Sequence, residues 1–230
     1  MSEAKLRFQS RLAIPCLQAA AHFAGLARSV ELDHEGEELS AFYDQIRWYS
    51  LSSVIQAVTS LEANINEWFL DAEYLTDLDD EGRSAVVKML DKESLLERYQ
   101  TALLLTGATK FSERSDPFQS VQILIRLRNS LVHFRPEWSD DQEDHEKLGK
   151  QLRGRFTLSP FFPDSSPVFP DRCMSGDLGK WAATAVLQFI QSFHLQSGTK
   201  TRFTEHFVAC LLYTSPSPRD LSTSRMPSSA

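Results

Sequence analysis

Apolar residues recur at helical spacing along most of the chain. The clearest stripe has steps that alternate between three and four residues, as in the seam of a packed helix. It consists of Leu51, Val54, Val58, Leu61, Ile65 and Trp68. The stripe predicts a long helix over residues 38–75. Ile55 and Phe69 widen the stripe to the apolar face of a bundle helix. The segment "DLDDEG" at 77–82 is expected to follow it as a loop.

Start and stop signals predict the other helices. Gly107 suits the C-cap of a helix over 92–105. Asp116 and Pro117 suit the start of a helix over 117–134, which Pro136 prevents from continuing. A polar helix is expected over 140–155, and a last one over 177–194. The apolar face of this last helix is Val186, Phe189, Ile190 and Phe193, and Gly198 closes it.

The remaining segments complete the picture of an all-α fold. The face made by Leu12, Cys16, Ala19, Phe23 and Leu26 predicts an N-terminal helix. Four prolines within residues 159–170 predict an extended crossover. No segment keeps the alternation of a strand, so we expect a mostly antiparallel helical bundle with four to five core helices.

Composition narrows the class of protein. A chain of 230 residues with 42% hydrophobic residues is long enough for one domain with a real core. Its formal charge of −7 argues against a protein that coats nucleic acid non-specifically, although a small basic cleft stays possible. Three cysteines indicate neither a disulfide framework nor a zinc ribbon. No apolar run approaches the roughly 20 residues of a membrane span, and we expect a cytoplasmic protein.

The last 21 residues, "CLLYTSPSPRDLSTSRMPSSA", differ from everything before them. They are rich in serine and proline, as disordered tails are. They also resemble a translated sequencing adapter: residues 210–220 can be written in codons as one adapter segment, and 224–230 as the segment after a sample index. We therefore expect a native domain over 1–209 and a non-native tail over 210–230. Without Arg219, Asp220 and Arg225 of the tail, the formal charge falls from −7 to −8.

The helix over 117–134 carries an arginine in its predicted apolar stripe. That stripe consists of Val121, Leu124, Ile125, Leu131 and Val132. Arg128 lies four residues after Leu124 and three before Leu131. A buried guanidinium needs a carboxylate, a phosphate or a wet cleft, because it does not lose its proton. Glu62 and Glu67 of the long helix are candidate partners in a purely structural ion pair.

Two further residues of this helix favour phosphate chemistry. Asn129 and His133 are four residues apart and so share a helix face. An arginine can contact an anion, a histidine can give or take a proton near neutral pH, and an amide can orient either of them. The alternatives are a structural arginine, a histidine that caps the helix end and a surface amide.

The stretch "RNSLVH" resembles the R-N-x-x-x-H motif of the HEPN superfamily, with Arg128, Asn129 and His133 in the motif positions. The resemblance covers a core of about residues 40–195. It implies a metal-independent endoribonuclease that needs no cofactor and acts as a homodimer, with the two motif helices meeting across the two-fold axis. His133 would act as general acid and base, Arg128 would stabilise charge on the phosphate and Asn129 would orient it. Glu62 would support Arg128.

The resemblance also implies possible partners. Some relatives are toxins that a partner nucleotidyltransferase, the antitoxin, neutralises by modifying a tyrosine two places after the histidine. Arg135 occupies that place here, so this mode of control is not expected in the same form. A toxin–antitoxin or phage-defence role stays a hypothesis.

Three functions therefore stay open. RNA cleavage is favoured if the basic residues near the motif cluster in space; these are Arg126, Arg135, Lys150, Arg153 and Arg155. The acidic charge favours a non-catalytic module that binds a nucleotide or a protein. A structural dimerisation module would hold Arg128 against Glu62 and leave no open cleft.

Overall fold

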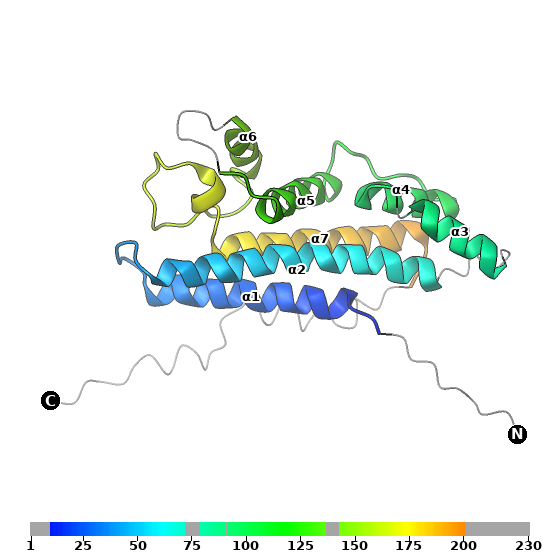
Figure 1. Ribbon diagram of the computed structural model, residues 1–230, viewed down its shortest axis with the longest axis horizontal. Helices are drawn as coiled ribbons and strands as arrows, with labels where there is room; N and C mark the ends of the chain where they lie inside the picture. The colour runs from blue at the N-terminus through cyan, green and yellow to red at the C-terminus, as the bar shows by residue number, and fades with distance from the viewer. Residues whose placement is uncertain (1–9, 72–78, 91, 137–142, 201–230) are drawn as a thin grey trace, which may run out of the picture.

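The computed structural model describes residues 10–71, 79–90, 92–136 and 143–200. Every regular element in these ranges is helical, which confirms the all-α prediction (Figure 1). The helices are α1 (Ala13–Asp33), α2 (Phe42–Asp71), α3 (Asp80–Leu90), α4 (Leu95–Leu105), α5 (Phe118–Val132), α6 (Glu143–Leu152) and α7 (Gly176–Ser197). A short irregular helical turn, η2 (Val168–Arg172), precedes α7. The tail at 210–230 lies outside the described residues.

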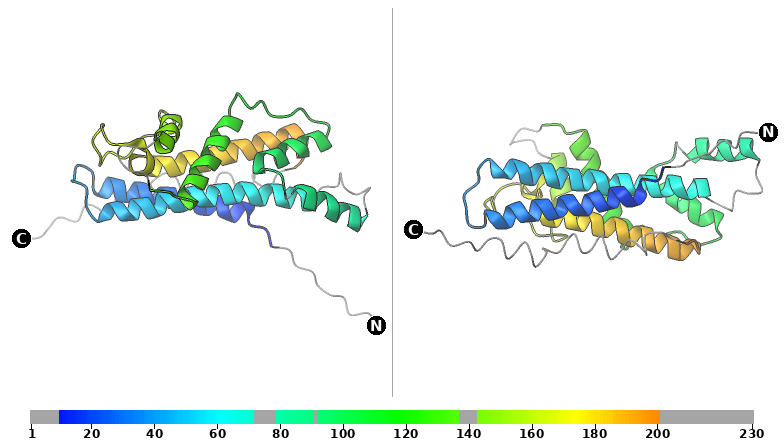
Figure 2. Two further views of the ribbon diagram at one scale, coloured as in Figure 1. Left: turned by 45° about the horizontal axis from the view of Figure 1, so that its top comes forward. Right: turned by 90° about the horizontal axis from the view of Figure 1, so that it is seen from below.

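Helices α1, α2 and α7 pack side by side along the long axis of the molecule (Figures 1 and 2). α1 runs antiparallel to α2, since the Ser53 hydroxyl donates to the carbonyl of Ala20 at 2.8 Å while the later Ser60 donates to the earlier Ala13 at 2.6 Å. These buried serines satisfy their own polar groups against the neighbouring backbone. They therefore fix the register of the two helices without exposing a polar group to the core.

The third helix, α7, runs in the same direction as α2. The Ser50 hydroxyl donates to the carbonyl of Ser175 at 3.0 Å, and farther along both chains Asn64 meets His194 at 3.3 Å. The bundle is therefore only partly antiparallel, and a long connection must return the chain to the start of α7. Helices α3 to α6 form this connection on one side of the layer (Figure 1).

The predicted stripe of α2 is largely correct. Val54, Val58, Leu61, Ile65 and Trp68 are all buried. The helix turns this face toward α1 and α7, where burial of apolar surface is the main stabilising contribution. The same pattern that predicted the helix therefore builds the centre of the core.

The predicted face of α1 is wrong. Leu12 is 58% exposed, and the buried face consists instead of Ala13, Leu17, Ala20, Ala21, Ala24 and Ala27. The helices approach so closely here that a Cβ added to Gly176 would lie 2.7 Å from the Cα of Arg28. Small side chains permit this approach, which larger ones would prevent. The bundle consequently includes α1, which precedes the stretch of about residues 40–195 that the resemblance covers.

The predicted loop after α2 is also wrong in its second half. Asp79 accepts a hydrogen bond from the backbone N–H of Gly82 at 2.7 Å, and α3 begins at Asp80. A short acidic side chain at this position stabilises a helix start. In contrast, the end of α4 before Gly107, whose φ is +72°, agrees with the predicted stop signal.

The predicted crossover at 159–170 is mostly irregular, but it is held in place at its end. The Arg172 guanidinium donates to the carbonyl of Asp164 at 2.6 Å and to its carboxylate at 2.6 Å. The last residues of the crossover form η2, which packs against α6. None of the helices described is long and apolar enough to cross a membrane.

Candidate functional site

The motif helix α5 crosses the face formed by α2 and α7 (Figure 2). Asp116 stabilises its first turn by accepting from the backbone N–H of Ser120 at 3.2 Å and from the Ser120 hydroxyl at 2.6 Å. Its buried residues are Phe118, Val121, Ile123, Leu124 and Leu127. None of the residues that follow Leu127 in this helix is buried, so the motif lies where α5 leaves the core.

The sequence predicted that Arg128 lies within the buried stripe, and this prediction is wrong. It is half-buried at the edge of that stripe, and Leu127 is the fully buried residue at this level of the helix. Val132, which belonged to the predicted stripe, is 52% exposed. The reason is geometric: α5 crosses the bundle at an angle, so its last turns no longer face the layer beneath.

The expected partners of Arg128 are engaged elsewhere. Glu62 lies 3.4 Å from the guanidinium of Arg98 and does not support Arg128. Glu67 accepts from the backbone N–H groups of Leu12 and Ala13 at 2.7 and 2.9 Å, where it caps α1. Within the described parts of the chain, Arg128 forms no ion pair. Its guanidinium is thus free to contact a ligand.

Asn129 and His133 lie on the exposed side of α5. Both residues are exposed, and the backbone N–H of His133 donates to the carbonyl of Asn129 at 2.9 Å, which closes the last turn. Arg126 lies three residues before Asn129 and shares this face. Arg128 is five residues before His133, which places the two side chains about 140° apart around the helix. One chain consequently brings Asn129, His133 and Arg126 together but turns Arg128 away.

A cluster of rings joins the end of α5 to α6. His145 contributes an Nε2–H that donates to the carbonyl of Arg135 at 3.1 Å, and its ring stacks on Phe134 at a centroid distance of 5.5 Å. Phe169 meets His145 edge-on at 5.0 Å. Arg135 itself is exposed. Its backbone therefore has a structural role that does not depend on its charge.

The basic residues near the motif form a hollow between α5 and α6, which we call the basic hollow. Its volume is about 620 Å³. It is lined by Gln119, Gln122, Ile123, Arg126, Lys150, Gln151, Arg153, Gly154 and Arg155. Four of the five cations expected to cluster are therefore together, and Arg135 is the exception. No carboxylate of the described residues lines this hollow.

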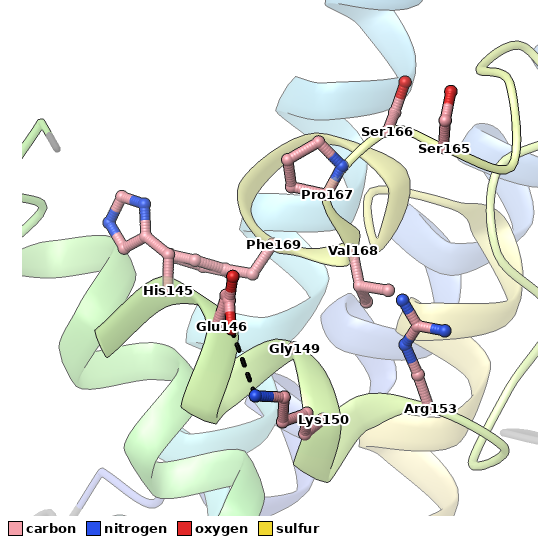
Figure 3. A pocket seen from close by; sticks show the side chains of 10 residues that line it. All are labelled: His145, Glu146, Gly149, Lys150, Arg153, Ser165, Ser166, Pro167, Val168 and Phe169. Atoms are coloured by element: carbon pink, nitrogen blue, oxygen red, sulfur yellow. Dashed lines mark hydrogen bonds and ion pairs between the residues drawn. The ribbon is translucent and has the colours of Figure 1, made fainter. Parts of the chain in front are cut away.

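A second, smaller hollow of about 290 Å³ adjoins the first and shares Lys150 and Arg153 with it (Figure 3). Its wall comes from α6 and from the crossover before η2, which contributes Ser165 and Ser166. Glu146 also lines it and forms an ion pair with Lys150 at 3.0 Å. Because both partners of this pair are well exposed, it neutralises Lys150 only weakly.

The described residues contain no group of three or more His, Cys, Asp or Glu side chains that could hold a metal ion. The chemistry available at this site is that of cations, amides and one exposed imidazole. Comparisons with protein-family models, with curated proteins and with solved structures found no match for this chain. The motif and its surroundings are thus the features of this chain that indicate a function.

Sequence reasoning missed the two hydroxyls of the crossover and the amides of the basic hollow. Gln122 lies four residues before Arg126, so helical spacing alone places both on one face. Ser165 and Ser166 carry no such signal, because only the path of the crossover brings them to α6.

Proposed function

We propose that this protein is a metal-independent endoribonuclease of the HEPN type. The observation that carries the proposal is Arg128, a half-buried guanidinium without an ion pair among the described residues, on the same helix as the exposed Asn129 and His133. A cation in this setting is suited to an external anion. The basic hollow along the Arg126 face of the same helix can attract a polyanion to an otherwise acidic protein.

The proposed reaction uses the ribose 2′-hydroxyl as the nucleophile. His133 takes the proton of that hydroxyl while its oxygen forms a bond to the adjacent phosphorus. The bond from phosphorus to the 5′-oxygen breaks, and the leaving oxygen takes a proton from a second, protonated imidazole. Arg128 stabilises the charge that grows on the phosphoryl oxygens. The products are a 2′,3′-cyclic phosphate and a 5′-hydroxyl.

A homodimer completes this site. In one chain Arg128 and His133 lie on different sides of α5, and the reaction needs a second imidazole. A second α5 across a two-fold axis can supply both missing groups. Val132 and Phe134, which are 52% and 46% exposed, offer apolar surface next to the motif for such a contact.

A non-catalytic module that binds a nucleotide or a protein is the second candidate. The separation of Arg128 from His133 within one chain favours it, as does the formal charge of −7. In that case Arg128 and the basic hollow would bind an anion that the protein does not cleave.

We expect Arg128→Ala to lower the rate of RNA cleavage by about 100- to 1000-fold, because it removes one preorganised donor to the transition state. Arg128→Lys should retain part of the activity, since it keeps the charge but loses the planar fork. The assay follows total RNA with the full-length protein in EDTA. Arg114→Ala is the matched control, because Arg114 is an exposed arginine outside α5. Equal rates for Arg128→Ala and the wild type would contradict the proposed role.

A further inference from the structure

Three arginines line the basic hollow, and none of them forms an ion pair with a residue that the structure describes. Among the residues described, the one polar partner of the Arg126 side chain is the amide oxygen of Gln151, at 3.4 Å. Arg155 donates to the carbonyl of Gln151 at 2.9 Å and to the hydroxyl of Ser120 at 3.1 Å. The side chain of Arg153 has no polar partner among the residues described. Three arginines thus line one hollow to which the described parts of the chain contribute no carboxylate.

This arrangement is unusual for the chain, which has 31 acidic and 24 basic residues. Elsewhere its arginines do meet carboxylates: Arg98 lies beside Glu62, and Arg172 beside Asp164. Arginines held close together by neutral groups repel one another, and that cost is offset when an anion binds between them. The basic hollow is therefore suited to bind an anion.

The size and shape of the two hollows indicate a linear polyanion. The basic hollow is open, and the smaller hollow of about 290 Å³ continues it past Lys150 and Arg153. Ser165 and Ser166 of the crossover line the same smaller hollow as these two cations (Figure 3). A single small anion needs one such recess, whereas a strand with repeated phosphates can occupy both. A recess between two helices also admits a flexible single strand more readily than a rigid duplex.

The basic hollow is continuous with the motif along α5. Arg126 precedes Asn129 by three residues and His133 by seven, which corresponds to about 5 and 10 Å along the helix axis. The same face of the helix therefore presents a backbone-binding cation and then the reactive groups. A short stretch of one strand can reach both.

We propose that the basic hollow binds the phosphodiester backbone of the single-stranded RNA that α5 cleaves, with Arg126, Arg153 and Arg155 as its principal cations. This inference rests on the proposed function, since it assigns the substrate strand of the same site. Phosphate contacts position a strand without reading its sequence. The hollow accordingly sets where the strand lies, and the motif acts on the phosphate delivered to it.

The test measures RNA binding by two double variants, each of which loses a pair of positive charges. A fluorescein-labelled single-stranded RNA of mixed sequence is titrated with the full-length His133→Ala protein in EDTA, so that it stays intact. Arg126→Gln with Arg153→Gln removes two cations from the hollow. Lys110→Gln with Arg114→Gln removes the same charge from exposed positions in the loop before α5. Each pair is measured over a range of salt concentrations.

We expect the hollow pair to weaken binding by about tenfold and the loop pair by less than about twofold. The slope of log affinity against log salt should become shallower by about 1.4 for the hollow pair, as for the loss of two phosphate contacts to a single strand. Equal effects of the two pairs would overturn the proposal. Equal affinity for a duplex of the same length would overturn the choice of a single strand, and efficient displacement of the RNA by polyglutamate would assign the hollow to an acidic protein segment.

Failure of the inference and failure of the proposed function give different results. If the nuclease proposal fails, the wild type does not cleave RNA, yet the hollow pair still loses RNA binding. If the hollow proposal fails, the wild type cleaves RNA, and removing Arg126 and Arg153 in an otherwise wild-type chain leaves kcat/KM unchanged.

Discussion

His133→Ala should lower the rate of RNA cleavage by about 100- to 10,000-fold and leave the fold intact. The rate falls because a positioned general acid or base contributes that much to proton transfer. The fold survives because the His133 side chain is exposed and has no polar partner among the described residues. Its backbone N–H, which donates to the carbonyl of Asn129, is retained in alanine. The measurement compares initial rates in EDTA with thermal unfolding of both proteins.

His22→Ala is the matched control for this prediction. His22 is an exposed histidine on α1, a helix that lies against α2 and α7 and does not border the motif. Its variant should cleave RNA as the wild type does. Equal cleavage by wild type and His133→Ala would instead mean that the activity belongs to a contaminant or to another residue.

We expect the bundle to lose stability at acidic pH because of the buried residue His194. His194 is 7% exposed, near the end of α7. Its Nδ1 lies 2.8 Å from the hydroxyl of Thr199 and its Nε2 lies 3.3 Å from the side-chain amide of Asn64. Asn64 in turn accepts from the hydroxyl of the buried Tyr99 at 3.0 Å. Burial lowers the pKa of His194 to about 4, because this environment disfavours the charged imidazole.

The sign of the pH dependence follows from this lowered pKa. An unfolded histidine binds its proton near pH 6.5, whereas the folded one stays neutral down to about pH 4. The unfolded state therefore binds more protons between these values, and the folded state loses stability as the pH falls through that window. The full shift corresponds to about 3 kcal/mol in the free energy of unfolding. Above pH 6.5 this group has no effect on the pH dependence.

His194→Gln should remove most of this acid sensitivity, because glutamine can make similar hydrogen bonds and does not titrate. The free energy of unfolding in urea, followed by circular dichroism from pH 7 to pH 4, gives the comparison. His22→Gln should keep the wild-type profile. If His194→Gln loses as much stability as the wild type over the same window, the buried imidazole is not the cause.

The sequence predicts the elements of this fold better than their faces. The alternating steps from Val54 to Trp68 identify α2 and its buried side correctly. In α1, however, larger residues such as Leu12 drew the prediction to the wrong face, because alanine gives a weak periodic signal. Close helix approach buries alanine and glycine, and that approach depends on tertiary packing against α2 and α7, which the spacing within α1 does not show. The acidic segment at 77–82 likewise predicts a loop, whereas Asp79 accepts a hydrogen bond from the backbone N–H of Gly82 and so stabilises the start of α3.

At the candidate site, too, the sequence predicts the helix better than the surroundings of its side chains. The spacing of Arg128, Asn129 and His133 identified the helix that matters, but the burial of Arg128 depends on the angle at which α5 crosses the bundle. The predicted support from Glu62 failed because Arg98 lies beside that carboxylate. The basic hollow required tertiary contact between α5 and the residues after α6, more than twenty residues away in the chain. Spacing can show which residues share a helix face, but it cannot show which helix packs against that face.

The chemical ends of the RNA fragments test the central claim most directly. The full-length wild-type protein is incubated with single-stranded RNA in EDTA, and the fragments are analysed by mass spectrometry before and after treatment with a 2′,3′-cyclic phosphodiesterase. Attack by the ribose 2′-hydroxyl predicts fragments with a 2′,3′-cyclic phosphate and a 5′-hydroxyl, formed without a divalent metal ion. Intact RNA in the presence of folded, dimeric protein, or fragments with a 3′-hydroxyl and a 5′-phosphate, would contradict the proposed ribonuclease.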